Sequence, residues 1–74
     1  MALQLVTKPI LKIKAARLRM GLRQLDLAYK ANVPVSEVSR YETGQSRPYP
    51  SYAERLATVL GLKPEELTQA VEAQ

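Results

Sequence analysis

The chain has 74 residues, a formal net charge of +4, and neither Cys nor His, which leaves room for one small hydrophobic core and excludes disulfides, thiolate chemistry and most zinc sites. Because His and Cys are missing, acid-base or nucleophilic catalysis would depend on a few carboxylates, and these are scattered, so we expect no enzymatic activity and no cofactor. No apolar run approaches the roughly 18 residues that a membrane span needs, and the first residues lack the pattern of a secretory signal, so we expect no membrane partner and a cytoplasmic location.

Positive charge is concentrated in the first half of the chain. Between Lys8 and Lys30 there are seven basic residues and a single acidic residue, Asp26, whereas the later segments are balanced or acidic. Such a distribution suits a face that binds phosphates, and it also suits an ordinary solvated surface. Charge alone leaves both interpretations open.

Residues 1–8 are expected to form an N-terminal arm, and residues 9–74 a single domain. The arm contains Leu3, Leu5 and Val6, an alternation that is too short to identify a strand. A dimer strand, an arm packed on the domain and an unstructured end all agree with this pattern.

A first helix is expected over about residues 9–20. Ile10, Ile13 and Arg17 recur at three- and four-residue spacing, which is typical of a helix with one buried face. The proline at its start suits a first turn, where no backbone N–H is needed. Gly21 is expected to end the helix.

Two short helices follow, over about residues 24–31 and 35–43, joined by a tight break. Ala28 is the small residue that lets two helices cross closely, and Val38 would fill the angle between them. Asn32 stands where the first of these helices must end in the left-handed conformation, which Asn tolerates best after Gly. This is the pattern of a helix-turn-helix, and it indicates binding to DNA.

A fourth helix is expected to start near residue 50 or 51 and to end at Gly61. Ser51 and Glu54 have the spacing of a capping box at its start. Pro64 then opens a fifth helix, with Leu67 and Val71 facing inward.

The whole pattern resembles the Cro and repressor-type, or xenobiotic-response-element (XRE), family over roughly residues 10–68. Each motif is weak alone, but their joint order and spacing are specific. The resemblance implies an all-α, five-helix, lambda-repressor-like domain whose second and third helices form the helix-turn-helix. The residues that carry it are Arg17, Gly21, Leu22, Gln24, Leu27, Ala28, Val33, Val38, Ser39, Arg40, Glu42, Gly44, Pro48, Leu56, Ala57, Leu60 and Leu67.

The sequence departs from the family pattern at three places. The family tends to place Ser or Thr where this chain has Arg23 and Pro34, just before the second and third helices. Losing such a cap costs about 0.5–2 kcal/mol. The third departure is Asn32 in place of Gly, which adds modest strain at the turn.

The resemblance implies that the third helix enters the major groove of double-stranded operator DNA. Its base-reading face would be Val35, Ser36, Glu37, Ser39 and Arg40. A bidentate contact from Arg40 to guanine is the strongest candidate, with a phosphate contact or plain exposure as the alternatives. Val35 would meet a thymine methyl group, and Glu37 either accepts from a cytosine amino group or interacts with the helix dipole.

Phosphate contacts are expected from Arg23, Gln24, Gln45, Arg47 and Lys14. In the family, a glutamine at the position of Gln24 touches the backbone and supports the base-reading side chains; capping the helix is its structural alternative. Gln45 and Arg47 lie in the loop after the third helix, where the family contacts the DNA backbone.

The family also pairs the positions of Arg17 and Glu42 in a structural salt bridge between the first and third helices. A partly buried pair of this kind mainly positions the elements that it joins.

The predicted function is therefore a DNA-binding transcriptional regulator, most simply a repressor, that acts as a homodimer and has no small-molecule ligand. The alternative is an antitoxin-like or accessory module that uses the same fold to bind a protein. Leu62, Leu67 and Val71 of the fifth helix would form the dimer surface or complete the monomer core. Leu25 and Tyr29 lie one turn apart at exposed positions, and the N-terminal arm is one candidate for covering them.

Overall fold

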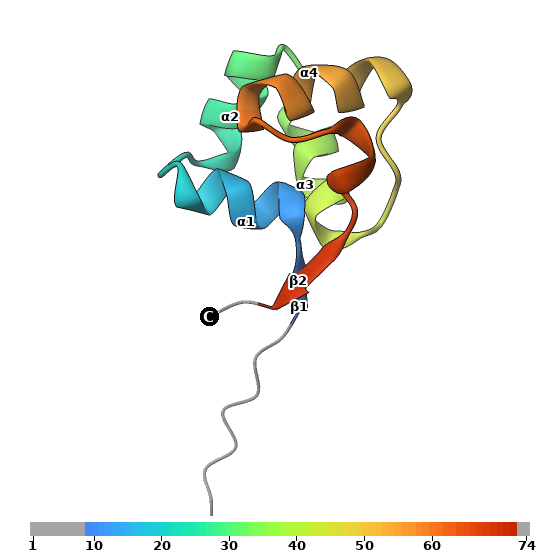
Figure 1. Cartoon of the computed structure of the whole chain (residues 1–74). Coiled ribbons are helices and arrows are strands. Elements are labelled where there is room, and N and C mark those ends of the chain that lie inside the picture. The colour runs from blue at the N-terminus through green and yellow to red at the C-terminus, as the bar shows by residue number, and fades with distance from the viewer. Residues whose placement is uncertain (1–8, 73–74) are drawn as a thin grey trace, which may run out of the picture.

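Four α-helices and a small two-stranded sheet make up the part of the chain that the computed structural model describes, residues 9–72 (Figure 1). The helices form the body, and the sheet lies beside it where the two ends of the described chain meet. The elements in order are β1 (Pro9–Leu11), α1 (Lys12–Arg19), α2 (Gln24–Ala31), α3 (Val35–Thr43), α4 (Pro50–Leu60), the 3-10 turn η1 (Pro64–Glu66) and β2 (Ala70–Glu72).

The core lies between the four helices. Ile13 of α1, Leu27 of α2, Val38 of α3 and Leu56 of α4 are fully buried, and Leu67 closes the core after η1. Burying side chains of this size stabilises a fold by about 1.5–3 kcal/mol each. A core shared by every helix holds α2 and α3 at a fixed angle.

The turn between α2 and α3 has the predicted left-handed residue. Asn32 has φ 57° and ψ 51°, and its backbone N–H donates to the carbonyl of Tyr29. Ala28 is buried, as the close crossing of the two helices requires. The bounds predicted for α2 and α3 agree with the structure.

The starts of the helices differ from the expectation at two places. Asp26 supplies the acidic half of a capping box at α2, because its carboxylate accepts from the backbone N–H of Arg23 at 2.8 Å. At α4 the predicted capping box of Ser51 and Glu54 is wrong. Tyr49 is the residue before the helix and makes no side-chain cap, and Pro50 occupies the first helical turn.

The first helix is shorter than predicted. Pro9–Leu11 is extended and pairs antiparallel with Ala70–Glu72, so that Ile10 lies opposite Val71. The helical spacing of the apolar residues continues into this strand. Over only three residues, spacing alone does not distinguish a helix from a strand.

The prediction of a fifth helix from Pro64 is also wrong, since the described residues after α4 contain no further α-helix. Pro64–Glu66 forms only a 3-10 turn, a further turn follows at Leu67 and Thr68, and the chain becomes a strand only at Ala70, beside the start of α1. There the carbonyl oxygens of Leu67 and Gln69 accept the backbone N–H groups of Ile13 and Lys12, at 3.1 and 2.8 Å. The first N–H groups of α1 have no acceptor inside that helix, and these bonds supply one. The same bonds use the carbonyl groups of residues 67 and 69, which are then not available to a fifth helix.

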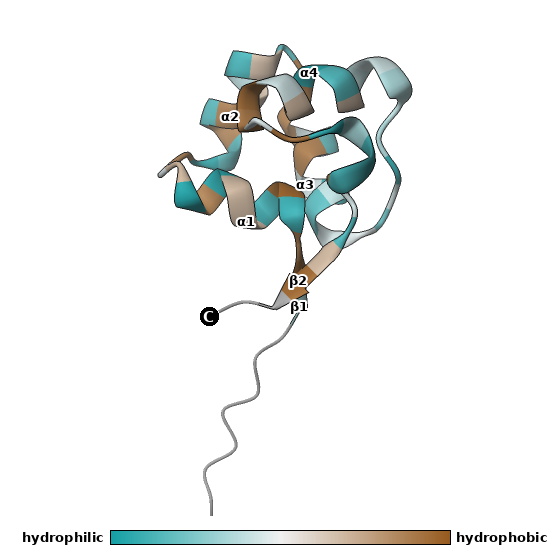
Figure 2. Cartoon of the chain, viewed as in Figure 1, coloured by the Kyte–Doolittle hydropathy of each residue, from teal (hydrophilic) through white to brown (hydrophobic). Residues whose placement is uncertain are grey.

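The sheet exposes an apolar strip outside the helical body. Figure 2 shows hydrophobic residues in both β1 and β2. Ile10, Leu11 and Val71 are all half-buried, and of the three only Leu11 packs against the core. Among the helices between residues 9 and 72, none is long and apolar enough to cross a membrane.

Candidate nucleic-acid interface

Helix α3 has a buried side and an outer side. Val38, Tyr41 and Glu42 are buried against the rest of the domain. Because residues three and four apart share a helix face, the intervening residues form the outer side. Ser36 and Arg40 are exposed there, Glu37 and Ser39 are half-buried, and Val35 is exposed in the first turn of the helix, toward α2.

The outer side therefore combines a cation, hydroxyl groups and a small apolar group. Among the hydrogen bonds of residues 9–72, none uses the guanidinium of Arg40 or the hydroxyl of Ser36. Both groups remain able to bind an external partner. Side chains of these types match the edges of bases in a major groove.

Glu37 is less available than its position in the sequence suggests. Its carboxylate oxygen Oε1 accepts the hydroxyl of Tyr41 at 2.9 Å, one turn further along α3. Burial, and then this bond to Glu37, raise the pKa of Tyr41 to about 12. The contact ties Glu37 to the core side of the helix.

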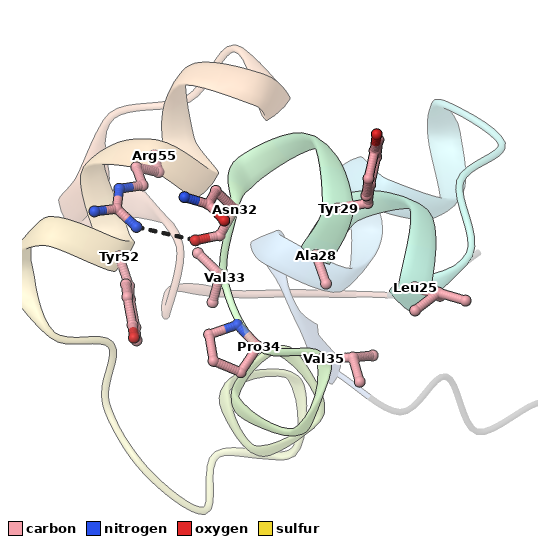
Figure 3. A pocket seen from close by; sticks show the side chains of 9 residues that line it. All are labelled: Leu25, Ala28, Tyr29, Asn32, Val33, Pro34, Val35, Tyr52 and Arg55. Carbon is pink, nitrogen blue, oxygen red and sulfur yellow. Dashed lines mark hydrogen bonds between the residues drawn. The ribbon is translucent and has the colours of Figure 1, made fainter.

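Helix α4 holds the turn that precedes α3. Arg55 donates from Nη1 to the carbonyl oxygen of Asn32 at 2.9 Å (Figure 3). Its guanidinium carbon also lies 5.5 Å from the centre of the Tyr52 ring. Since the carbonyl of Asn32 follows the last turn of α2, Arg55 supplies a donor where the helix leaves acceptors unpaired.

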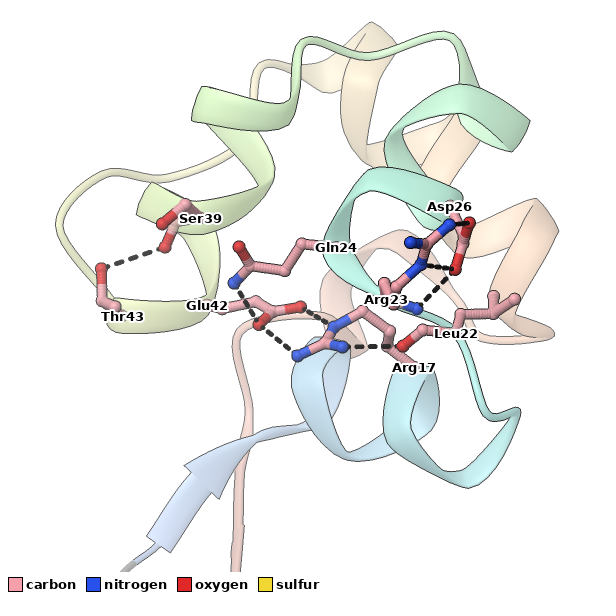
Figure 4. A network of polar contacts seen from close by, with 8 residues as sticks. All are labelled: Arg17, Leu22, Arg23, Gln24, Asp26, Ser39, Glu42 and Thr43. Atoms are coloured by element: carbon pink, nitrogen blue, oxygen red, sulfur yellow. Dashed lines mark hydrogen bonds and ion pairs between the residues drawn. The ribbon is translucent and has the colours of Figure 1, made fainter.

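A buried ion pair fixes the other end of α3. Arg17 donates to the carboxylate of Glu42 from Nε at 2.6 Å and from Nη2 at 3.0 Å (Figure 4). The third nitrogen of the guanidinium, Nη1, donates to the carbonyl oxygen of Leu22 at 2.7 Å. The pair predicted from the resemblance is thus present, and it joins α1, α3 and the connection to α2.

Gln24 belongs to the same network. Its Nε2 donates to Oε1 of Glu42 at 3.0 Å. Figure 4 shows the side chain extending from the start of α2 toward α3, with Glu42 between Gln24 and Arg17. The bond leaves the amide oxygen of Gln24 as an acceptor and directs the group beside α3.

Arg23 is engaged with Asp26. Its Nε and Nη2 lie 3.0 and 2.9 Å from the two carboxylate oxygens, on an exposed surface. The side-chain bond from Arg23, followed by the bond from its backbone N–H, lowers the pKa of Asp26 to about 2. A phosphate would have to compete with this carboxylate for Arg23.

The remaining phosphate candidates lie on two elements. Gln45 and Arg47 are exposed in the loop after α3, and the backbone N–H of Gln45 donates to the carbonyl of Arg40 at 2.9 Å. The loop thus starts in contact with the end of the helix. Lys14 lies apart from them, half-buried in the first turn of α1.

An open groove lies behind the turn, between α2, α3 and α4 (Figure 3). Its lining includes Leu25, Tyr29, Val35 and Tyr52. Tyr29 is 87% exposed and Leu25 58% exposed. The N-terminal arm, the predicted cover for this pair, lies outside the described residues.

Sequence reasoning missed several of these contacts. The pairing of Arg23 with Asp26 was detectable, because an acid at the third helical position is a known capping pattern. The bond from Gln24 to Glu42 and the bond from Arg55 to Asn32 join residues 18 and 23 positions apart. No local pattern predicts contacts of that kind.

Comparison with known proteins supports the resemblance. The family model described as helix-turn-helix matches residues 13–67, which span α1 to η1. No curated protein matches the chain.

Proposed function

Since this chain belongs to the Cro and C1-type helix-turn-helix family, a family of DNA-binding regulators, we propose that it is a sequence-specific regulator that reads operator DNA with α3. The observation that carries the proposal is the outer side of α3. Its exposed side chains stand on a helix whose opposite side is anchored in the core.

Arg40 is the residue that we assign to direct base reading. It is exposed, and the planar guanidinium can donate to both O6 and N7 of guanine, which is worth about 1–3 kcal/mol of discrimination. Ser36 and Ser39 would donate to base edges or phosphates, and Val35 would contact a thymine methyl group. Glu37 contributes to base reading only through the oxygen that does not bind Tyr41.

Phosphate contacts would set the register of the helix in the groove. Gln45 and Arg47 are the best placed, since their loop continues from the end of α3. Gln24 would contact a phosphate through the amide hydrogen that does not bind Glu42. Arg23 and Lys14 would add charge at the edge of this surface.

The simplest mode of regulation is repression by occupancy. A domain that covers an operator blocks another protein from the same DNA, and this needs no ligand. One helix reads too few base pairs to select a genomic site, so we propose that two copies bind a two-fold operator.

The second candidate function is that of a module that binds a protein partner. The exposed side chains of Leu25 and Tyr29 beside the groove favour it, because exposed apolar and aromatic side chains that lie together often mark a protein contact. The outer side of α3 favours DNA, since its exposed residues are mostly polar.

Selection of binding sites from a random duplex pool tests the proposal, with Arg40→Ala run in parallel. We expect a two-fold symmetric motif for the natural chain, and a preference relaxed at one base pair in each half-site for the variant. Arg19→Ala is the matched control, because it removes an exposed arginine from α1 and should leave the selected sequence unchanged. A pool without enrichment, combined with binding that disappears as salt rises, would contradict sequence reading and support the protein-binding alternative.

A further inference from the structure

The outer edge of β2 has backbone groups that do not bond to β1. In the antiparallel pair, Lys12 donates its backbone N–H to the carbonyl of Gln69, which lies opposite it in the register. Hydrogen-bonded and non-bonded pairs alternate along such a ladder, so the backbone of Val71 faces Ile10. The N–H and C=O groups of Ala70 and Glu72 then point away from β1.

The outer edge of β1 is less suited to pairing. The same alternation turns the backbone of Pro9 and Leu11 outward, and Pro9 has no N–H to donate. A proline in this position commonly prevents the addition of another strand. The sheet therefore has one edge able to accept a further strand, and that edge is β2.

Strand β2 is self-complementary about a two-fold axis through Val71. If a second copy of β2 lies antiparallel with the two Val71 residues opposite each other, Ala70 of each copy faces Glu72 of the other. Their outward N–H and C=O groups then exchange hydrogen bonds at both ends of the strand. Both copies would then use the same surface in the interface, as a two-fold symmetric dimer requires.

The side chains agree with this pairing. Leu11 packs on the core, so Ile10 lies on the opposite face of β1, and Val71 lies beside it as its cross-strand partner. Both are half-buried in the single chain, and Figure 2 shows hydrophobic residues in both strands. In the dimer, Ile10 and Val71 of both copies would form one apolar row across four strands.

Charge also favours this edge. The molecule is basic as a whole, at +4, but no Lys or Arg follows Lys63 in the sequence. The residues that pair in the β2 ladder, Ala70–Glu72, therefore place no cation of one copy opposite a cation of the other. An isolated two-stranded sheet is only marginally stable, and a four-stranded sheet with an apolar face is more stable.

We infer that the chain forms its homodimer by pairing β2 with β2 of a second copy, and not through a fifth helix. The inference rests on the proposed function, because a two-fold operator needs two α3 helices in a fixed arrangement. Strand β1 contacts α3, and β2 contacts α1, so the sheet is connected to the helices of the DNA-binding body. A sheet that continues through both copies would fix the two α3 helices in one relative orientation. Leu67, one of the residues expected either at a dimer surface or in the monomer core, is fully buried in the core.

Charge exchange at Val71 tests the interface. Val71→Lys and Val71→Glu keep the backbone of β2 but place like charges opposite each other in the dimer. Sedimentation velocity over a dilution series should show that each variant alone has a dimer dissociation constant raised at least tenfold. An equal mixture of the two should recover dimers of both chains.

Thr68→Lys is the matched control. It adds the same charge at an exposed position just before β2 and should dimerise as the natural chain does. Far-ultraviolet circular dichroism establishes that all variants are folded. A natural chain that stays monomeric, or a Val71→Lys variant that dimerises like Thr68→Lys, would overturn the inference.

Binding to the selected duplex separates this inference from the proposed function. A monomeric Val71→Lys variant that still prefers a single half-site supports both. A chain that dimerises through β2 but selects no sequence supports the interface and contradicts operator reading. A chain that selects a sequence but dimerises independently of Val71 supports operator reading and overturns the interface.

Discussion

The helix-turn-helix and the small sheet are held in different ways. Helices α2 and α3 share the core, and a buried carboxylate with three donors joins α3 to α1 and α2. Strands β1 and β2 have three residues each and only half-buried side chains at Ile10 and Val71. The comparison indicates that a single copy already holds the surface proposed for DNA binding in place. The stability of the sheet depends more on the segments that pack against it.

The largest effect is expected when Glu42 alone is replaced. Glu42→Leu leaves the guanidinium of Arg17 buried without its carboxylate, which typically costs about 3–5 kcal/mol. The double variant Arg17→Met with Glu42→Leu removes both charges and should recover much of that loss. Urea denaturation measures both free energies of unfolding. Strictly additive effects of the two single changes would contradict this account of the pair.

A smaller loss is expected from Leu67→Ala. Leu67 is fully buried where η1 leads toward β2, and truncation of such a side chain costs about 2–5 kcal/mol. Val71→Ala, in the half-buried sheet, should lower the free energy of unfolding of the monomer by clearly less. Thermal denaturation at low protein concentration compares the two. Equal losses would mean that the sheet contributes to the monomer as the core does.

The turn gives a third test. Asn32 has a left-handed conformation, and Asn32→Ala should lower the free energy of unfolding by about 1 kcal/mol, because a Cβ without a polar group disfavours that region. Asn32→Gly is the control and should be as stable as the natural chain or slightly more stable. Urea denaturation measures the free energy of unfolding of both variants. An Asn32→Ala variant as stable as Asn32→Gly, or more stable, would contradict the prediction.

The smallest effect concerns pH. The pKa of Asp26 falls from the ordinary 3.8 to about 2, since Arg23 donates to its carboxylate. A lowered pKa adds stability above about pH 4 that is lost as the pH falls toward 2. Asp26→Asn should therefore flatten the acid side of the stability profile between these values. A profile that is unchanged in Asp26→Asn would show that the pair, which is solvent-exposed, adds nothing measurable.

The same contrast separates what the sequence predicted from what it did not. The bounds of α2 and α3, the left-handed Asn32 and the buried side of α3 follow from local spacing and turn chemistry. The extended ends do not, because residues 9–11 become a strand only through a partner about 60 positions away. The start of α1 uses residues 67 and 69 as acceptors for the same reason, and no short-range pattern encodes that need.

The candidate site divides in a similar way. The exposure of Arg40 and the pairing of Arg17 with Glu42 could be expected from the helical period and the resemblance. The engagement of Glu37 by Tyr41 was within reach, since the two are four residues apart. The bond from Gln24 to Glu42 depends on how α2 and α3 meet, which the sequence alone does not specify.

The division of α3 into two sides has a consequence for how such a domain can change. Val35, Ser36 and Arg40 are exposed and contribute little to the core, and substitutions at positions of this kind usually alter stability by no more than about 0.5 kcal/mol. Their identities can therefore be exchanged, by mutation over generations or by an engineer, while the scaffold stays intact. One scaffold of this kind can therefore give rise to many domains that recognise different DNA sequences.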